Sequence, residues 1–290
     1  MGRAYEKWRE LCDQVQEPDG LPTWEEAGVW TRDKLYFWKR YVDITTNAMA
    51  RKSTSFPGGL VYVDLFGGAG ICTLKGTGER FPGSALIAAS AEKPFRKIII
   101  CEKDPGLAAA CEERLSKTPV ANGCRVLTGD CNQLIRAIVR EIPDRALTLA
   151  FIDPKGLDTR FETVKVLGPE ARTDFVVLFA DAYDAVRNNL QYYWDDPNSK
   201  LDETLGPDSN WREKLKEAGF PTGLEHRRLF ADIYTRQLQK HLGYTVFREK
   251  RVKSGGRPLY LLIYGSRHEL GRKFWDEACK EDSSGQKELF

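Results

Sequence analysis

Short apolar runs alternate with stretches of helical periodicity along the first 180 residues. Runs that are mostly apolar, without strict alternation, are typical of strands buried on both faces of a sheet. Five such runs predict strands, over residues 59–65, 96–101, 125–128, 147–152 and 174–179. Helix-start signals or helical spacing predict helices over residues 84–92, 104–115 and 132–142. This alternation indicates a parallel sheet with right-handed crossovers.

The alternation ends near residue 180, and the C-terminal part follows a different pattern. Residues 244–252 and 257–264 are strand candidates separated by the short sequence KSGG. So short a glycine-rich connection predicts an antiparallel hairpin. Five parallel strands closed by a hairpin describe the Rossmann-like, doubly wound α/β sheet of class I S-adenosylmethionine-dependent methyltransferases, with seven mostly parallel strands. That is the fold class we expect.

The chain divides into five expected parts. They are an N-terminal helical cap or lid (1–58), an α/β cofactor-binding core (59–180), a helical and loop insertion (181–222), a C-terminal helix and hairpin that complete the core (223–281), and a flexible tail (282–290). An insertion after the fifth strand lies at the carboxyl edge of the sheet, beside the ligand crevice. Thr222 is placed to cap the long helix that follows it.

A helix predicted over residues 31–44 carries an apolar stripe of Leu35, Trp38 and Val42. We expect it to fold over the cofactor edge with Lys34 and Arg32 toward the crevice. Ordinary packing of its aromatic residues against the sheet is an equal alternative.

Composition narrows the class of protein. The 290 residues are 41% hydrophobic, and no run approaches the ~20 apolar residues of a membrane span. The charged N-terminus has no signal-peptide core, so we expect a cytoplasmic protein. Seven scattered cysteines without a C-x-x-C pair, with three histidines, argue against a metal site. Net charge is only +2, but residues 226–228 and 248–257 form basic clusters that are either phosphate-binding or solvated faces.

The sequence VYVDLFGGAG, residues 61–70, holds the first candidate chemistry. A strand that ends at Asp64 and a turn with Gly67, Gly68 and Gly70 can hold a nucleotide-like cofactor, because glycine lets backbone approach a ligand closely. A helix that follows such a turn points its N-terminal N–H groups at the ligand. Phe66 lies within the same turn.

Acidic residues stand at or just beyond the carboxyl ends of the next predicted strands. In an open α/β sheet these ends border the ligand crevice. We expect Glu102 to accept hydrogen bonds from ribose hydroxyls, with Lys103 beside it. Asp130 would accept from the adenine amino group, with the Cys131 N–H facing the ring, and Asp64 would lie near the cofactor's ammonium or orient the loop. For Asp130 the alternative is a helix N-cap.

Two other nucleotide-binding classes fit less well. A nicotinamide site needs G-x-G-x-x-G with an acid ~20 residues further on. Here Thr73 stands where the third glycine belongs, and Glu102 lies too far along the chain. A phosphate-binding G-x-x-x-x-G-K-[ST] loop is absent from the sequence.

The sequence Asp153-Pro154-Lys155-Gly156 follows the fourth strand and is the candidate reaction edge, with the first three residues as the catalytic set. Amino-methylating enzymes of nucleic acids carry D/N-P-P-Y/F at this place, where the ring stacks on a base. Lys155 removes that ring, so a flipped base needs another platform. The aromatic candidates are Tyr183, Tyr192, Tyr193 and Trp194. Trp30, Lys34, Tyr183 and Arg187 are the expected substrate or lid residues.

The chain resembles the three-Cys-motif partner protein family, TcmP, through most of its length. The motifs that carry the resemblance are WTRDKLYFWKRYV (30–42), YVDLFGGAG (62–70), GTGERFPGS (76–84), GDCN (129–132), FIDPKGL (151–157) and LGPDSNW (205–211). The chain departs from the family at Lys155, where D-P-Y-G is usual, and at Gly67 and Ala85, where Ala and Pro are common.

The resemblance implies a class I methyltransferase-like fold with S-adenosyl-L-methionine as cofactor, and a partner that is a three-cysteine, radical-S-adenosylmethionine-like protein. The resemblance does not establish the substrate. From the Asp153-Pro154 motif we expect a methyltransferase acting on nucleic acid. The alternatives are a non-catalytic or cofactor-sensing partner subunit, and a protein methyltransferase. The methylated atom, the choice among DNA, RNA and protein, and the oligomeric state are left open by the sequence.

Overall fold

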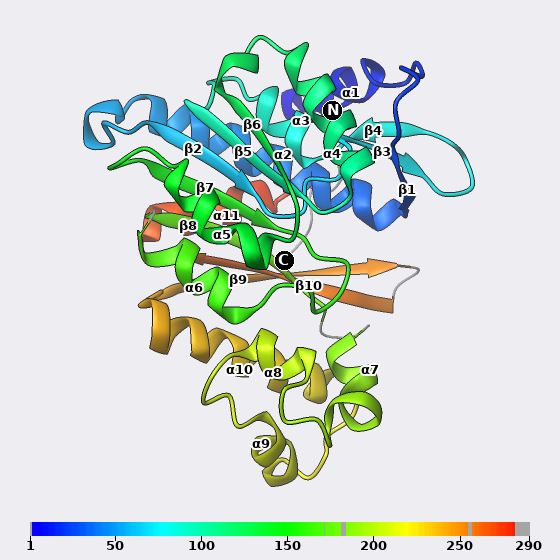
Figure 1. The fold of residues 1–290 in the computed structure, drawn as a ribbon, viewed down its shortest axis with the longest axis vertical. Helices are drawn as coiled ribbons and strands as arrows, with labels where there is room; N and C mark the ends of the chain where they lie inside the picture. Colours follow the sequence, from blue (N-terminus) through cyan, green and yellow to red (C-terminus); the bar gives the residue numbers. More distant parts are fainter. Residues whose placement is uncertain (1, 171, 181–183, 255–256, 282–290) are drawn as a thin grey trace.

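The computed structural model describes residues 2–170, 172–180, 184–254 and 257–281. Its centre is a seven-stranded sheet with helices on both faces, flanked by a small sheet at one end and a group of short helices at the other (Figure 1). The strand order is β6-β5-β2-β7-β8-β10-β9. The strands are β2 (Leu60–Asp64), β5 (Lys97–Glu102), β6 (Cys124–Thr128), β7 (Leu147–Ile152), β8 (Thr173–Phe179), β9 (Val246–Ser254) and β10 (Arg257–Ser266).

The pairing of these strands confirms the predicted fold class. Strands β6, β5, β2, β7 and β8 are parallel to one another, whereas β10 is antiparallel to both β8 and β9. The chain winds outward from β2 to β6 and then returns to add β7 and β8 on the other side. This is the class I methyltransferase fold. The order reverses between β2 and β7, which places the ligand crevice of such a sheet at their carboxyl ends.

Helices form two layers over the sheet. One layer contains α2 (Val29–Ala50), α3 (Ser84–Ala89), α4 (Pro105–Ser116) and α11 (Glu269–Ala278). The other contains α5 (Cys131–Arg140), α6 (Phe161–Glu170) and α10 (Gly223–Leu242), which Figure 1 shows in front of the sheet and below it. Central strand residues such as Val61, Val63 and Ile99 are fully buried between these layers, as their apolar runs predict.

Between the glycine loop and helix α3 lies an element that the sequence analysis did not predict. A hairpin of β3 (Ile71–Leu74) and β4 (Arg80–Pro82) intervenes, and it pairs with β1 (Trp24–Ala27) in a three-stranded sheet. The Gly83 N–H then donates to the Gly70 carbonyl at 2.7 Å. This bond returns the chain to the loop just before α3 begins.

Helix α2 is part of the core. Trp38 stacks on Phe151 of β7 with ring centroids 4.4 Å apart, and Tyr41 is fully buried. Ordinary packing of the aromatic stripe is thus confirmed. We expected a lid, but only the first turns of α2, which carry Lys34, reach the strand ends. Helix α1 (Arg3–Asp13) precedes α2 in the chain.

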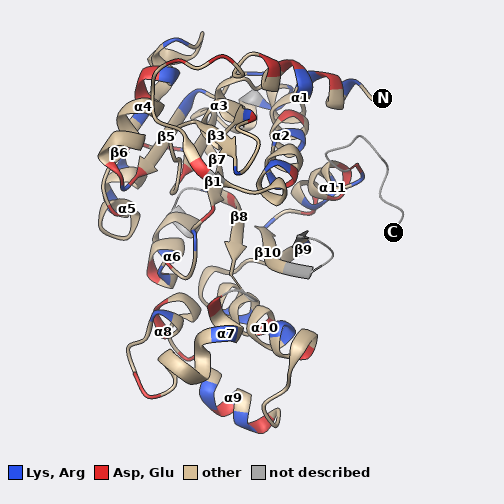
Figure 2. Ribbon diagram, turned by 90° about the vertical axis from the view of Figure 1, so that its right-hand side faces the viewer, with Lys and Arg blue, Asp and Glu red and all other residues tan. Residues whose placement is uncertain are grey.

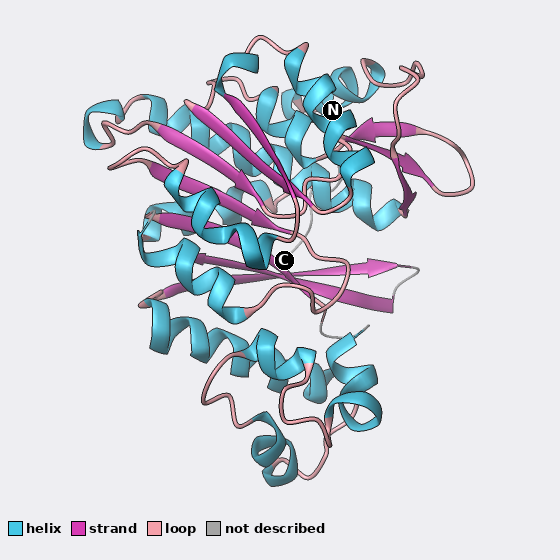
Figure 3. Ribbon diagram, in the orientation of Figure 1, coloured by secondary structure: helices cyan, strands magenta, loops and turns pink. Residues whose placement is uncertain are grey.

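The insertion after β8 consists of short helices, as expected (Figure 3). They are α7 (Val186–Asn188), a π-helical turn (Asn189–Tyr193), α8 (Lys200–Leu205) and α9 (Trp211–Glu217). Outside the insertion, short 3-10 turns lie at Ser53–Ser55 and Ala121–Gly123. Thr222 occupies the N-cap position of α10, but its side chain makes no capping bond, contrary to our expectation. Within the described parts of the chain, no helix combines the length and apolarity needed to cross a bilayer.

Candidate functional site

The glycine loop is anchored by a buried acid. Asp64 is fully buried at the end of β2, where its Oδ1 accepts from the Phe66 N–H at 3.0 Å and its Oδ2 from the Tyr62 hydroxyl at 3.2 Å. Trp38 donates to that same hydroxyl at 3.0 Å. Burial raises the pKa of Asp64 to about 7. Of the two roles predicted for Asp64, these contacts match orientation of the loop.

The three glycines of the loop serve different needs. A Cβ on Gly67 would lie 2.2 Å from Ile100 Cγ2, so this glycine is required by packing against β5. Gly68 and Gly70 have φ values of +59° and +80°, in the left-handed region that favours glycine. A Cβ on Gly68 would meet nothing within 4 Å. The Gly68 backbone therefore borders open space that a ligand can enter.

Glu102 links the loop to the neighbouring strand. Its Oε2 accepts from the Gly68 N–H and its Oε1 from the Asp104 N–H, both at 2.8 Å. Two backbone donors thus fix the half-buried carboxylate at the end of β5. Each carboxylate oxygen accepts more than one hydrogen bond, so acceptor capacity remains for two ligand hydroxyls.

Asp130 forms the N-cap of α5, because its Oδ1 accepts from the Asn132 N–H at 2.9 Å. The alternative predicted for Asp130, a helix N-cap, is thus confirmed for Oδ1. Oδ2 lies 3.6 Å from the exposed Lys103 ammonium. Cys131 is buried in the first turn of α5, where burial raises its thiol pKa to about 12. The Asn132 side chain braces the segment after β7 by accepting from the Arg160 N–H at 3.0 Å.

Asp153 at the end of β7 pairs with Lys34 of α2, across 119 residues of sequence. The Lys34 side chain is 6% exposed and that of Asp153 18% exposed, so the pair is largely removed from solvent. Pro154 is buried beside them. Lys155 is exposed, with its Nζ 5.7 Å from the centre of the Trp24 ring. Lys34 is thus an ion-pair partner of Asp153 that no local motif indicates.

Sequence reasoning missed two residues next to this edge. Asp184 braces the loop after Pro154, since its Oδ2 accepts from the Leu157 N–H at 3.2 Å and its Oδ1 from the Tyr193 hydroxyl at 2.6 Å. Tyr260 of β10 lies under Lys34, whose Nζ is 5.6 Å from its ring centre. Its hydroxyl is buried and has no hydrogen-bond partner in the described part of the structure. Neither residue belongs to a recognisable motif.

The expected substrate residues are spread more widely. Trp30 packs over Gly28, where a Cβ would lie 2.3 Å from its ring, and Arg187 is exposed on α7. Tyr183 lies outside the described residues. Of the predicted stacking platforms, Tyr192 is 62% exposed, whereas Tyr193 and Trp194 are partly buried. Arg32, which we expected to face the crevice, pairs with Glu79 of the hairpin loop at 3.1 Å.

The basic clusters are partly engaged within the protein. His226 is buried against the Asn189 amide, 3.3 Å away, and burial lowers its pKa. Arg248 pairs with Asp276 at 3.1 Å, and Lys250 lies 4.5 Å from the centre of the Phe37 ring. Lys and Arg positions (blue) and Asp and Glu positions (red) are interspersed along the helices of the ribbon (Figure 2).

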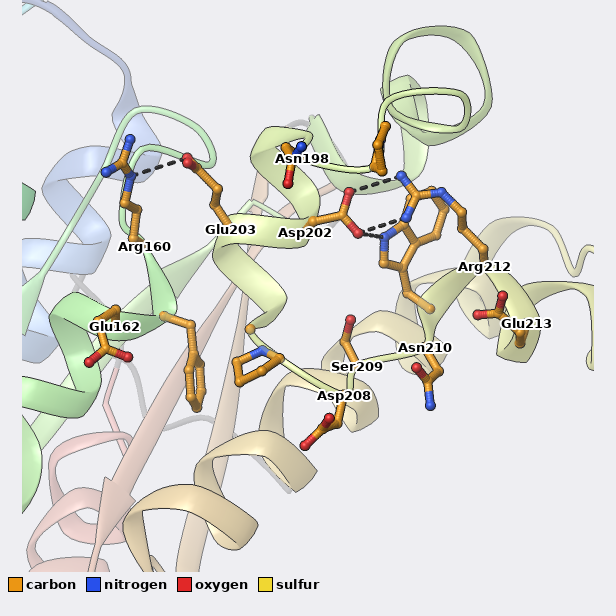
Figure 4. Close-up of a pocket in the computed structure, with 15 residues that line it drawn as sticks. Arg160, Glu162, Asn198, Asp202, Glu203, Asp208, Ser209, Asn210, Arg212 and Glu213 are labelled. Atoms are coloured by element: carbon orange, nitrogen blue, oxygen red, sulfur yellow. Dashed lines mark hydrogen bonds and ion pairs between the residues drawn. The ribbon is translucent and has the colours of Figure 1, made fainter.

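A cavity of about 500 Å³ lies in the insertion, between the start of α6 and helices α8 and α9 (Figure 4). Two ion pairs lie in its lining: Asp202 pairs with Arg212 at 2.7 Å and Arg160 with Glu203 at 3.2 Å. Its lining contains none of the predicted cofactor or catalytic residues. The candidate site is therefore the strand-end crevice and not this cavity.

The described segments contain no group of three or more His, Cys, Asp or Glu side chains placed to hold a metal ion. None of the seven cysteines, all of which lie in described segments, forms a disulfide.

Comparison with known proteins gives a fold-level picture. No family model matches the chain, and no curated protein matches it either. Among solved structures, Legionella pneumophila protein LPL1258 has a TM-score of 0.48 at 12% identity, covering 87% of this chain and 95% of that one. The Bacillus cereus O-methyltransferase in complex with SAH has a TM-score of 0.43 at 9% identity, with coverages of 92% and 91%. Streptomyces achromogenes O-methyltransferase TomG in complex with SAM has a TM-score of 0.40 at 14% identity, with the same coverages. Similarities this weak do not assign an activity to the chain.

Proposed function

We propose that the chain is a cytoplasmic S-adenosylmethionine-dependent methyltransferase. The observation that carries this proposal is the Glu102 carboxylate, which two backbone N–H groups fix between β5 and the glycine loop. A fixed acceptor at the end of the strand next to a glycine turn suits a ribose diol. Asp130 offers a second acceptor just beyond the end of the adjacent strand β6, for the adenine of the same ligand.

The cofactor supplies an activated methyl group when it is bound, so the protein's task is to position an acceptor. Asp153 stands at the next strand end on the other side of β2, where its carboxylate can accept a hydrogen bond from an acceptor amine or hydroxyl. An acceptor bound there has to share the carboxylate with Lys34.

We propose nucleic acid as the acceptor class. This choice is supported by the resemblance of Asp153-Pro154 to the motif of amino-methylating enzymes. It is supported also by the exposed ring of Tyr192 and the exposed Arg187 on the insertion beside the crevice, since an aromatic face and a guanidinium are the groups that bind an unstacked base and its phosphate.

One observation favours a second function. The largely buried Lys34–Asp153 pair occupies the carboxylate that an acceptor would need, and Lys155 replaces the usual aromatic ring. Both features suit a cofactor-sensing subunit that binds S-adenosylmethionine without transferring its methyl group. Such a role agrees with the TcmP resemblance, which supplies a three-cysteine protein as the partner.

A labelled-methyl assay separates these functions. Purified protein is incubated with methyl-labelled S-adenosylmethionine and, in turn, denatured DNA, total RNA and the co-expressed three-cysteine protein. Label in DNA or RNA supports the nucleic-acid methyltransferase. Label in the protein partner alone points to a protein methyltransferase. Cofactor binding without label in any acceptor supports the sensing subunit.

A further inference from the structure

Arg114 of α4 is a buried arginine that joins the N-terminal segment to the glycine loop. Its side chain is 5% exposed. Its Nε and Nη2 donate to the two carboxylate oxygens of Asp19 at 2.7 and 2.9 Å. The same guanidinium donates to the carbonyls of Pro22 at 2.8 Å, Leu21 at 3.3 Å and Ala69 at 2.6 Å. All five N–H donors of the guanidinium therefore have an acceptor.

The bond to Ala69 determines how the loop presents its backbone. Ala69 lies between Gly68 and Gly70, whose left-handed conformations allow the intervening peptides to take more than one orientation. Arg114 draws the Ala69 carbonyl toward α4. Because a trans peptide is planar, the N–H of Gly70 then points in the opposite direction. Among the described residues, that N–H has no hydrogen-bond acceptor.

The next peptide is held as well, since the Gly70 carbonyl accepts from Gly83 N–H. Two successive carbonyls of the loop are thus bound on the protein side. Asp19 completes the arrangement: the Arg114 guanidinium, with Arg80 beside it, holds the pKa of that carboxyl well below its usual range. The Asp19 carboxylate stays charged and keeps the guanidinium in place.

We propose that Arg114 is a positioning residue for the amino-acid end of the cofactor. By turning the Ala69–Gly70 peptide, it aims the Gly70 N–H at the carboxylate of the bound methionine moiety. Asp19 and the segment around it act through Arg114. This inference rests on the proposed function, because it assigns a contact within the same cofactor site.

The test uses two ligands and a matched control. S-Adenosylhomocysteine carries the amino-acid end, whereas 5′-methylthioadenosine keeps the nucleoside and lacks that end. The control variant is Arg212→Gln, because Arg212 also binds an aspartate, Asp202, and three backbone carbonyls, but in the insertion. Calorimetry on the full chain gives both affinities, and thermal unfolding gives the stability of each variant.

Arg114→Gln is expected to lower the affinity for S-adenosylhomocysteine by about ten- to a hundredfold, as for the loss of one charge-assisted contact. It should lower the affinity for 5′-methylthioadenosine by less than about threefold. Arg212→Gln should leave both affinities unchanged. A structural role alone would lower both affinities together or neither, and either result overturns the assignment of Arg114. If Arg114→Gln does not fold, Asp19→Asn replaces it in the test. It should then weaken S-adenosylhomocysteine binding and leave 5′-methylthioadenosine binding nearly unchanged. If the unaltered protein binds neither ligand, the proposed function itself is overturned and this assignment with it.

Discussion

Replacing Glu102 by alanine is the most informative single change in the candidate site. The Glu102 carboxylate accepts from the Gly68 and Asp104 N–H groups at 2.8 Å each, and it is the group expected to bind the ribose hydroxyls. Glu102→Ala therefore removes the ligand contact and also frees the glycine loop from β5.

The size of the effect follows from the chemistry of these bonds. A hydrogen bond to a charged group contributes about 1.5–3 kcal/mol. Loss of the ribose contact should therefore lower the affinity for S-adenosylhomocysteine by about ten- to a hundredfold. The two freed N–H groups are near the surface and can bind water, so the free energy of unfolding should fall by no more than roughly 1–2 kcal/mol.

Isothermal titration with S-adenosylhomocysteine measures the first effect, and chemical denaturation measures the second. Glu113→Ala is the matched control, because Glu113 lies on α4, the helix that follows β5, and pairs with the exposed Lys117 at 2.9 Å. It should change neither quantity measurably. An unchanged affinity in Glu102→Ala would refute the assignment of Glu102 to the ribose.

Three further changes test other parts of the account. Asp153→Asn should strongly reduce methyl transfer, by ~10²–10⁴ as for loss of a proton acceptor, while cofactor affinity changes less than about tenfold; normal transfer in a labelled-methyl assay would remove Asp153 from the mechanism. Lys34→Met leaves the Asp153 carboxylate without its partner and should lower the melting temperature more than Asp153→Asn does; equal melting curves would contradict a buried ion pair. Burial raises the pKa of Asp64 to about 7, so the folded chain keeps a proton that the unfolded chain loses above roughly pH 4. The contribution of Asp64 to the free energy of unfolding should therefore fall as pH rises from about 4 to 7. In Asp64→Asn, chemical denaturation at several pH values should show a free energy of unfolding that lacks this decrease.

Predictions from sequence succeeded where a local pattern determined the structure. The apolar runs located the central strands within a residue or two, because buried parallel strands leave little room for polar side chains. The acids at the strand ends were found for the same reason: Glu102 and Asp130 interrupt otherwise apolar or turn-like sequence.

Predictions from sequence failed where contacts between segments far apart in the chain determine the structure. Nothing near Asp153 in sequence announces that Lys34 is its partner, and the hairpin of β3 and β4 is too short to show strand periodicity. Arg114 did leave a signal, since it lies on α4 among the buried Ala108, Cys111 and Leu115. A charged residue on an apolar helix face needs buried acceptors, but sequence spacing does not identify Asp19 or Ala69 as those acceptors.

The most direct test of the central claim is a calorimetric titration of the purified protein with S-adenosylmethionine, with NAD⁺ titrated in parallel. The account predicts saturable binding of one S-adenosylmethionine per chain, reduced at least tenfold in Glu102→Ala, and no heat of binding with NAD⁺. Absence of S-adenosylmethionine binding, or saturable binding of NAD⁺ in its place, would contradict it.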